Sequence, residues 1–323
     1  MLEDSRLEQP LTLYVRDATY RFSAAGIVSA RTDAELITCH VLGMSRAQLG
    51  KELVYGTTLY AALAYKHTGS INDALEQLDA AVARRATRVP LQHITGLAPF
   101  RHIELLVGSG VFIPRPETEL IVDHVAVALS EYSEPRIADL CAGSAAIGIC
   151  LALEIPTSHV WAVEYDEKSY EWTRRNIDHY KQQIAHNGSD ITAICADATT
   201  GLAGMEGSFH AVASNPPYIP AHCVPRDVEV RDFDPQMALF GGGEDGFVIP
   251  TAITRRAGQL LVPGGYFIME HGENQGALAQ DTLKKHGFID VETLPDLTGR
   301  QRFTAGYKNA HEHTRGPRSG QQL

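Results

Sequence analysis

From about Arg136 onward, short apolar runs alternate with helical stretches, and this alternation limits the fold more than any other feature of the sequence. Strands that alternate with helices form βαβ units with right-handed crossovers, and such units assemble into a mainly parallel sheet. The expected strands read RIADL, HVWAVE, ITAICAD, FHAVAS and GYFIME. We expect helices from about Ala145, from about Lys168, and near 251–261 and 275–286.

Two final β-rich runs, FIDVETL and RFTAGYK, have no helical stretch between them. They should therefore pair as an antiparallel hairpin at the end of the sheet. The sequence predicts an α/β fold with a doubly wound, Rossmann-like sheet of seven strands.

The front of the chain has a different periodicity, because apolar residues recur at helical spacing up to about Arg88. The segment HITGLAPFRHIELLVGSGVFIP then places β-rich runs on either side of Gly-Leu-Ala-Pro, which predicts an extended or hairpin connector. The polar stretch HEHTRGPRSGQQL near the end is typical of disorder. We expect a helical domain over 1–89, a connector over 90–113, the sheet domain over 114–309 and a disordered tail over 310–323.

Composition narrows the class of protein. The chain has 28 basic and 39 acidic side chains, a formal charge of −11, so general attraction to phosphates cannot be the main source of any nucleic-acid affinity. The first residues, MLEDSRLEQP, lack the basic start and apolar run of a signal peptide, and no apolar stretch reaches the ~20 residues of a membrane span. We expect a cytoplasmic protein with no membrane partner.

The cysteines argue against a disulfide framework and against a zinc site. They are five in number and form no Cys-x-x-Cys pair. We expect free thiols and no metal centre.

The turn after the first strand is a candidate ligand site. It reads Asp139-Leu-Cys-Ala-Gly-Ser-Ala and opens a helix, which is where a doubly wound sheet binds its ligand. Small residues let a ligand approach the backbone, and the helix start offers free N–H groups. These are Ala142, Gly143, Ser144 and Ala145. An ordinary tight turn explains the segment equally well.

Acidic residues end the next two strands. Glu164 lies about 20 residues beyond the turn, where a carboxylate can accept hydrogen bonds from ribose hydroxyls, and Asp197 ends the third strand in the same way. A solvated acid is the simpler explanation, and it suits the neighbouring Asp166 as a helix N-cap. Together these features indicate an adenosine-containing ligand, either NAD or S-adenosylmethionine.

The loop after the fourth strand carries the reaction chemistry. It reads Ser214-Asn-Pro-Pro-Tyr-Ile-Pro, and adjacent prolines hold it rigid. The Asn215 amide oxygen and the Pro216 carbonyl oxygen can accept the two hydrogens of a planar NH2 group while Tyr218 stacks on its face. A proline-rich turn that merely closes the strand is the alternative.

These residues resemble a known family. Asn215-Pro216-Pro217-Tyr218, after such a turn, resembles the signature of class I S-adenosylmethionine-dependent methyltransferases that act on planar amino or amide nitrogen, adenine-N6 enzymes included. The rest of the chain, from about Asp33 to Tyr307, is similar to the release-factor glutamine-N5 methyltransferases. The matching segments are Asp33–Leu36, Leu42–Arg46, Arg84–Arg85, Pro90–Gly96, Phe112–Glu119, Asp234–Gly242, Asp245–Gly246, Glu270 and Asp296–Arg302.

The resemblance implies methyl transfer from S-adenosylmethionine to the glutamine N5 of the Gly-Gly-Gln motif in peptide-chain release factors, which supports translation termination. The release factor is the implied partner, recognised by the helical front domain, with no direct nucleic-acid substrate. The implied substrate residues are Asn215 to Tyr218, with Asn215, Pro216 and Tyr218 in catalysis. The implied cofactor residues are Cys141, Ala142, Gly143, Ser144, Ala145, Glu164, Asp197, Ala198 and Asn215.

The chain departs from the family pattern at four positions. Ala145 replaces a glycine, and its methyl group is expected to crowd the ligand or shift the backbone. Glu164 replaces a shorter aspartate, Ala198 an aromatic residue, and His93 a tyrosine.

Two segments keep more than one interpretation. Arg115 and Glu117 either cap a helix or help to shape the site. The segment from Ile219 to Phe247 is long for a structureless loop, so we expect a lid or recognition element, with 241–243 as its hinge.

Two other functions use the same motifs. An adenine-N6 nucleic-acid methyltransferase requires a flipped base and a basic channel, against which the net charge argues. A binding protein that has lost catalysis would explain Ala145 and Ala198, but the intact Asn215–Tyr218 motif argues against that loss.

Overall fold

The computed structural model describes residues 5–64 and 70–310. The chain divides into two compact units, which we treat separately. The helical unit comprises Met1–Leu97 and Pro225–Phe233, and the sheet unit comprises Ala98–Val224 and Asp234–Leu323. The tail expected over 310–323 lies outside the described residues apart from Ala310.

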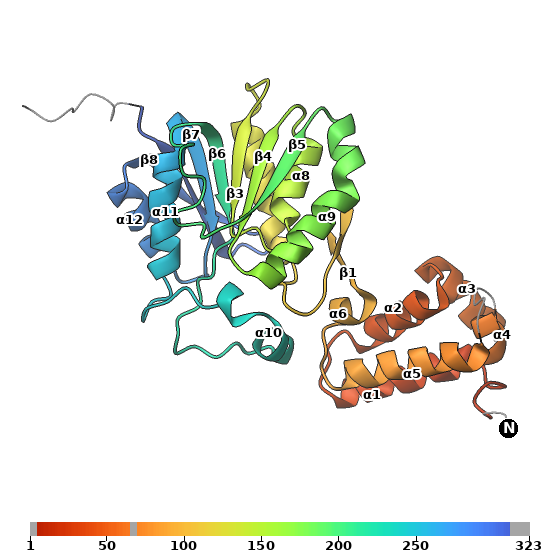
Figure 1. The fold of residues 1–323 in the computed structure, drawn as a ribbon. Helices are drawn as coiled ribbons and strands as arrows, with labels where there is room; N and C mark the ends of the chain where they lie inside the picture. The colour runs from red at the N-terminus through yellow and green to blue at the C-terminus, as the bar shows by residue number, and fades with distance from the viewer. Residues whose placement is uncertain (1–4, 65–69, 311–323) are drawn as a thin grey trace, which may run out of the picture. The chain divides into compact units, whose positions relative to one another are not determined.

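The sheet unit contains a seven-stranded sheet in the order β5-β4-β3-β6-β7-β9-β8 (Figure 1). The first five strands in sheet order are parallel, whereas β9 pairs antiparallel with β7 and β8. The doubly wound fold and the final hairpin are confirmed. The strands are β3 (Arg136–Leu140), β4 (His159–Glu164), β5 (Asp190–Cys195), β6 (Phe209–Ser214), β7 (Leu261–Glu270), β8 (Phe288–Pro295) and β9 (Gln301–Lys308).

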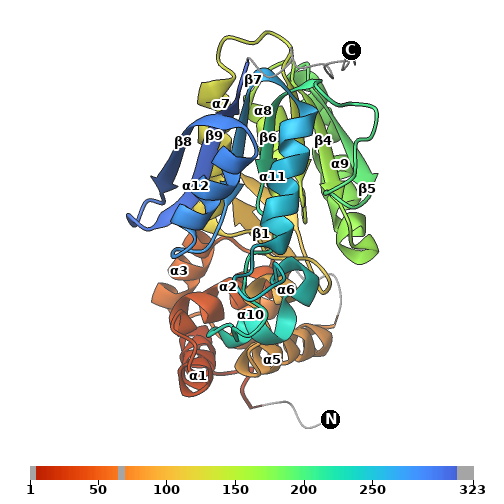
Figure 2. The same cartoon turned by 90° about the vertical axis from the view of Figure 1, so that its left-hand side faces the viewer.

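Helices cover both faces of this sheet because successive strand residues point to opposite sides. Ile137 packs in one apolar cluster with α7, α8 and α9, whereas Ala138 packs in another with α11 and α12. Figure 2 shows the α11 face. The helices of the sheet unit are η1 (Pro116–Glu119), α7 (Leu120–Ala128), α8 (Ala146–Glu154), α9 (Glu167–His186), η2 (Gln236–Ala238), α11 (Val248–Leu260) and α12 (Gly276–Lys285).

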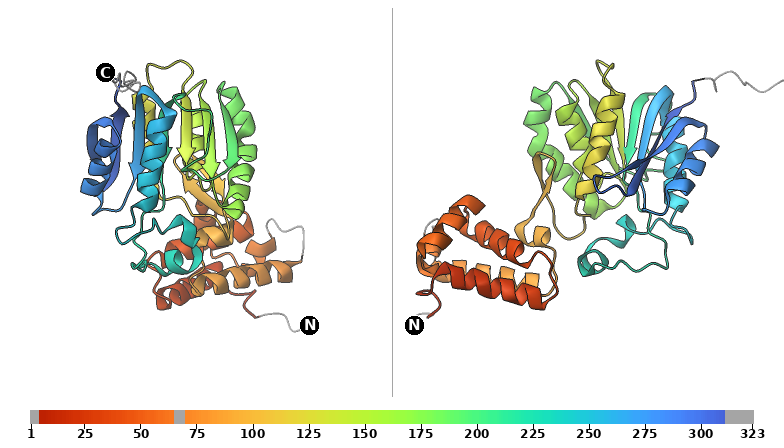
Figure 3. Two further views of the ribbon diagram at one scale, coloured as in Figure 1. Left: turned by 60° about the vertical axis from the view of Figure 1, so that its left-hand side comes forward. Right: turned by 180° about the vertical axis from the view of Figure 1, so that it is seen from behind.

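The helical unit has its own apolar core, which includes Leu11, Phe22, Ile37 and Leu78. Its helices from the first 97 residues, red and orange in Figure 3, confirm the expected helical front, and α10 is drawn in teal. They are α1 (Leu11–Ala24), α2 (Ala30–Leu42), α3 (Arg46–Tyr55), α4 (Leu59–Ala64), α5 (Ile71–Ala86) and α6 (Leu91–Thr95), together with α10 (Val228–Phe233) from the later segment.

The expected connector is correct in its second half only. β1 (Leu97–Phe100) and β2 (Ile103–Leu106) form a two-stranded sheet, as predicted. Leu91–Thr95, however, forms the short helix α6 instead of an extended run. Pro90 precedes its first turn, and Gly96 ends it in the left-handed conformation, so local capping outweighs the β propensity.

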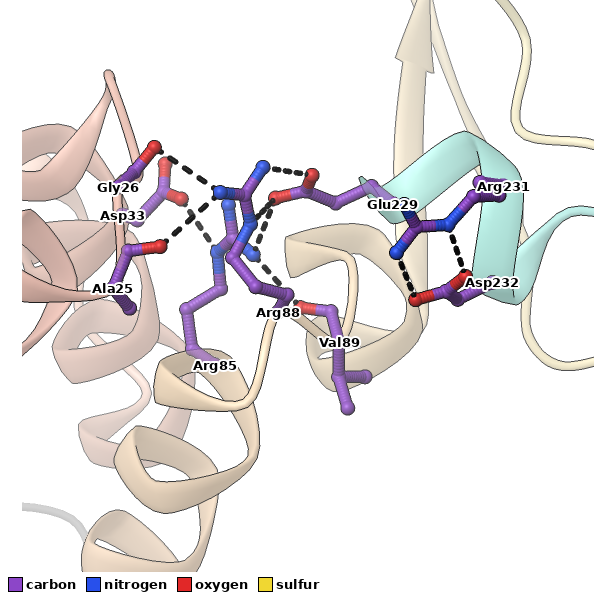
Figure 4. A network of polar contacts seen from close by, with 9 residues as sticks. All are labelled: Ala25, Gly26, Asp33, Arg85, Arg88, Val89, Glu229, Arg231 and Asp232. Atoms are coloured by element: carbon purple, nitrogen blue, oxygen red, sulfur yellow. Dashed lines mark hydrogen bonds and ion pairs between the residues drawn. The ribbon is translucent and has the colours of Figure 1, made fainter. Parts of the chain in front are cut away.

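The segment expected to form one lid belongs to both units. Residues 225–233 are part of the helical unit, while the flanking parts of 219–247 belong to the sheet unit. Glu229 of α10 accepts hydrogen bonds from Arg85 and Arg88, and Arg85 also donates to Asp33 at 2.7 Å (Figure 4). These ion pairs fix α10 to the end of α5.

Across the two described stretches of the chain, none of the helices has the length and apolar character that crossing a membrane requires.

Candidate active site

The turn between β3 and α8 has an unusual backbone. Cys141, Gly143 and Ala145 have φ values of 64°, 58° and 64°, so left-handed residues alternate with ordinary ones. The N–H groups of this turn are bonded within the protein, since Ala142 N donates to the Val163 carbonyl oxygen at 3.0 Å and Ala145 N to the Ala142 carbonyl oxygen at 2.8 Å. A side chain in this conformation costs about 1–2 kcal/mol, so the turn holds strain at Cys141 and Ala145.

Gly143 is the most open point of the turn. A Cβ added there would meet no heavy atom within 4 Å, so a ligand can approach the backbone. Ala145 differs, because its side chain is 0% exposed and packs in the core. The methyl group therefore faces the core and does not crowd a ligand, contrary to one of the two expectations for this position. The left-handed backbone is what remains unusual about Ala145.

Glu164 joins the end of β4 to this turn. Its carboxylate oxygens accept hydrogen bonds from the backbone N–H of Gly143 at 2.8 Å and of Asp166 at 2.9 Å. Burial raises the pKa of Glu164 and outweighs these hydrogen bonds, which lower it. Asp166 itself caps α9 by accepting from Ser169 N at 3.0 Å, as predicted.

A polar residue, Asp197, and an apolar residue, Ala198, follow the carboxyl end of β5. Asp197 is exposed, and one carboxylate oxygen accepts from the backbone N–H and the hydroxyl of Thr199 at 2.8 and 2.7 Å. Ala198 is 4% exposed and belongs to the apolar cluster on the α11 face. Its methyl group therefore offers no open surface for an adenine ring.

The Asn215–Tyr218 loop follows β6 and is held at both ends. The Asn215 amide NH2 donates to the Thr118 hydroxyl at 3.2 Å, and the Tyr218 hydroxyl donates to Glu270 Oε1 at 3.1 Å. Gln275 donates to the Tyr218 carbonyl oxygen at 2.9 Å. Pro216 and Pro217 are buried. Within the part of the chain that the structure describes, no protein donor reaches Asn215 Oδ1 or the Pro216 carbonyl oxygen, so both can accept from a substrate.

Thr118 and Glu270 were not among the predicted site residues. Thr118 donates to Glu270 Oε2 at 2.6 Å, and both side chains are buried. Burial raises the pKa of Glu270 to about 7, although hydrogen bonds from Thr118 and Tyr218 lower it. An acid at the carboxyl end of the apolar run GYFIME, on the strand beside the Asn215 loop, was the available signal for Glu270.

Thr118 lies in the Phe112–Glu119 segment, whose path places it beside Asn215 and Glu270. Arg115 pairs with Asp234 at 2.5 Å and lies over the Phe112 ring, with 4.7 Å to the centroid. Glu117 lies in the first turn of η1, and its charge raises the pKa of Glu270. The start of η1 has no side-chain cap hydrogen bond, so neither Arg115 nor Glu117 has the expected capping role, and their part in shaping the site stays a prediction.

The five cysteines are free thiols. Over residues 5–64 and 70–310, no cluster of three or more histidine, cysteine, aspartate or glutamate side chains could hold a metal ion.

Comparison with known proteins places this site in context. Family models match residues 14–96, as the PrmC N-terminal domain, and residues 109–231, as the methyltransferase small domain. The chain is 40% identical over 297 residues to a release factor glutamine methyltransferase of Bifidobacterium longum, covering 91% of this chain and 98% of that protein. It is 40% identical over 301 residues to the protein of the same name from Streptomyces coelicolor, covering 91% and 96%. The solved hMettl16 catalytic domain matches at 14% identity with a TM-score of 0.50, covering 75% of this chain and 84% of that chain, which is a likeness of fold alone.

Proposed function

The chain belongs to the release factor glutamine methyltransferase family, and on this premise we propose which of its residues carry out the reaction. The enzyme transfers a methyl group from S-adenosylmethionine to a glutamine side chain of a release factor. We propose that this glutamine lies in a Gly-Gly-Gln motif, that N5 is the methylated atom, and that the modification supports translation termination in the cytoplasm, where release factors act.

Cys141–Ala145, Glu164, Asp197, Ala198 and Asn215 are proposed to hold S-adenosylmethionine. The turn fits this group, because Gly143 leaves open space beside the backbone, where a Cβ would meet no heavy atom within 4 Å. Glu164 has the acceptor oxygens that ribose hydroxyls require. Ala145 and Ala198 contribute through their backbone, since both side chains are buried in the core. When bound, S-adenosylmethionine supplies a strongly activated sulfonium methyl group.

Asn215, Pro216 and Tyr218 are proposed to hold the glutamine amide. The two hydrogens of its NH2 group are donated to Asn215 Oδ1 and the Pro216 carbonyl oxygen, the two acceptors that the protein leaves unused. The Tyr218 ring stacks on the amide plane, while its hydroxyl stays on Glu270. Pro217 keeps the loop rigid.

Positioning is the proposed source of most of the rate enhancement. An amide nitrogen is a weak nucleophile because its lone pair is delocalised into the carbonyl group. Accepting both N–H hydrogens raises the electron density on nitrogen and holds it in one orientation, an effect that can be worth ~7 kcal/mol or more. No general base is required, since an alkylated amide nitrogen loses its proton readily to water.

The single observation that carries this proposal is the free acceptor pair in the rigid loop, so the test removes one acceptor. Asn215→Ala should lower single-turnover methylation of a release factor by about 10²-fold, or ~3 kcal/mol. Binding of S-adenosylmethionine should fall much less, because most of its proposed contacts lie elsewhere. Asn72→Ala, which removes an exposed amide from α5, is the matched control and should retain the wild-type rate.

Both variants must show the wild-type circular dichroism spectrum before their rates are compared. Methylation by Asn215→Ala within a few-fold of wild type would exclude Asn215 as the residue that positions the amide.

The proposal also states the partners. Residues 1–89 are proposed to recognise the release factor, 90–113 to connect, and 114–309 to carry out methyl transfer, with no nucleic acid or membrane as direct partner. The helical unit exposes Val54 and Tyr55 at 84% and 77%, which suits a protein surface. Methyl-labelled S-adenosylmethionine should be offered with release factor, DNA and RNA in parallel. Label on either nucleic acid would favour the adenine-N6 alternative.

A further inference from the structure

Two buried residues behind the Asn215 loop form a chain of hydrogen bonds that leads to its amide. Strands β6 and β7 are parallel with Ser214 beside Met269, so Asn215 and Glu270 follow at the same edge of the sheet. Glu270 Oε2 accepts from the Thr118 hydroxyl at 2.6 Å, and Thr118 Oγ1 accepts from the Asn215 NH2 at 3.2 Å. Thr118 and Glu270 are 4% and 1% exposed, so water does not compete for these bonds.

The direction of these hydrogen bonds follows from the number of protons available. An ionised carboxylate can only accept, so the Thr118 hydroxyl must donate its single hydrogen to Glu270. The Thr118 oxygen is then an acceptor, and only the NH2 end of the Asn215 amide can satisfy it. The Asn215 oxygen consequently points to the other side, away from Thr118.

We propose that Thr118 and Glu270 are positioning residues that fix the direction of the Asn215 amide, so that its oxygen and not its NH2 group meets the substrate. This inference rests on the proposed role of Asn215 as an acceptor for the glutamine amide. The second oxygen of Glu270 holds the Tyr218 hydroxyl, so one carboxylate orients both ends of the substrate loop.

Protonation of Glu270 reverses the direction of the hydrogen bonds from Glu270 through Thr118 to Asn215. A proton on Oε2 is donated to the Thr118 oxygen, which frees the Thr118 hydrogen to donate to Asn215. The Asn215 amide then turns its NH2 group towards the substrate NH2, and two donors face each other. The rate should therefore fall as Glu270 takes up a proton.

The surroundings of Glu270 place this change near neutral pH. Burial raises its pKa to about 7, the Glu117 carboxylate acts in the same direction, and the hydroxyl of Tyr218 and the Arg302 guanidinium lower it. Arg302 also forms an ion pair with Asp296, with 3.5 Å between Arg302 Nε and Asp296 Oδ2. His271, the next residue in the chain, bonds the Thr304 hydroxyl at 2.8 Å, and burial lowers its pKa.

The first test compares two substitutions of Thr118 under single-turnover conditions with saturating release factor and S-adenosylmethionine. Thr118→Val keeps the shape and removes the hydroxyl, and it should lower the rate by about 10-fold, the effect of one lost hydrogen bond. Thr118→Ser restores the hydroxyl and should return the rate to within a few-fold of wild type. Thr282→Val, which removes a buried hydroxyl bonded within α12, is the matched control and should keep the wild-type rate.

The second test is the pH profile of the same rate. Wild type should lose about tenfold between pH 8 and pH 6, as expected for a required carboxylate with a pKa near 7. Glu270→Gln has no proton to gain, so its rate should not fall over that range. Binding of S-adenosylmethionine should be unchanged in every variant.

Three results would overturn the inference. The first is a methylation rate in Thr118→Val within twofold of wild type. The second is an equal loss of methylation rate in Thr118→Val and Thr118→Ser. The third is a wild-type methylation rate that does not change between pH 8 and pH 6. The Glu270→Gln profile decides the question if Thr118→Val does not fold. Asn215→Ala is measured beside these variants so that two failures can be told apart. A lower rate in Asn215→Ala with an unchanged rate in Thr118→Val rejects only the positioning role of Thr118 and Glu270. An unchanged rate in Asn215→Ala rejects the proposed function of Asn215 itself.

Discussion

Replacing Ala145 by glycine tests whether the turn between β3 and α8, which is proposed to bind the cofactor, is strained. Ala145 has a φ of 64°, which costs a residue with a side chain about 1–2 kcal/mol and costs glycine nothing. Relief of this strain is the gain expected from Ala145→Gly.

Two losses oppose the gain. The Ala145 side chain is 0% exposed, so removing its methyl group forfeits about 0.8 kcal/mol of burial. Glycine also gives the unfolded chain more freedom, at roughly 0.5–1 kcal/mol. Gains and losses nearly cancel, so the free energy of unfolding should change by less than about 1 kcal/mol.

Ala152→Gly is the matched control. Ala152 is also 0% exposed, but it lies inside α8, where there is no left-handed strain to relieve. The free energy of unfolding of Ala152→Gly should fall by about 2 kcal/mol, because the same buried methyl group is lost and glycine has a low helix propensity. The difference between the two variants measures the cost of the left-handed backbone at Ala145.

The assay is urea unfolding followed by tryptophan fluorescence. The chain has two tryptophans, Trp161 in β4 and Trp172 in α9, and both lie in the sheet unit, so the signal reports on that unit. Titration calorimetry should give an affinity for S-adenosylmethionine that is equal or tighter in Ala145→Gly. Equal losses of stability in the two variants would show that the turn stores no strain, and a clear loss of affinity would contradict the conclusion that the Ala145 methyl group does not face the ligand.

Two further predictions concern buried charge. Glu229→Gln should lower the stability of the helical unit by about 1–3 kcal/mol in circular dichroism melts, because Arg85 and Arg88 lose their shared charged partner. Asp232→Asn, in an exposed ion pair with Arg231, should leave the melting temperature unchanged, and equal effects of the two substitutions would contradict this prediction. Burial raises the pKa of Asp139 to about 7, so the folded state holds a proton that the unfolded state releases, and wild-type stability should fall as pH rises from about 4 to 7. Asp139→Asn should make that fall smaller in urea titrations at pH 5 and pH 7, and an unchanged slope would count against the buried acid.

The position of a candidate site residue was predictable wherever it follows from the end of one strand and its turn. The turn after β3, Glu164 and the Asn215 loop each end a strand, and parallel strands bring such ends to one edge. The roles of these residues remain predictions until the variants are measured. Glu270 also ends a strand, but its partner Thr118 lies 152 residues away in the sequence. Their pairing depends on the path of the Phe112–Glu119 segment, which no local pattern encodes.

The sequence by itself determined the order and type of the strands and helices of the sheet from Arg136 onward, because the periodicity of apolar residues acts within a few positions of the chain. It also located the strand ends on which the residues proposed to bind cofactor and substrate lie. It did not predict the short helix α6, which depends on its caps. Only the tertiary structure decided that residues 225–233 join the helical unit, that Cys141 and Ala145 adopt the left-handed conformation, and that Thr118 connects Glu270 to Asn215. These features depend on hydrogen bonds and packing between distant segments, which exist only after the strands are in register.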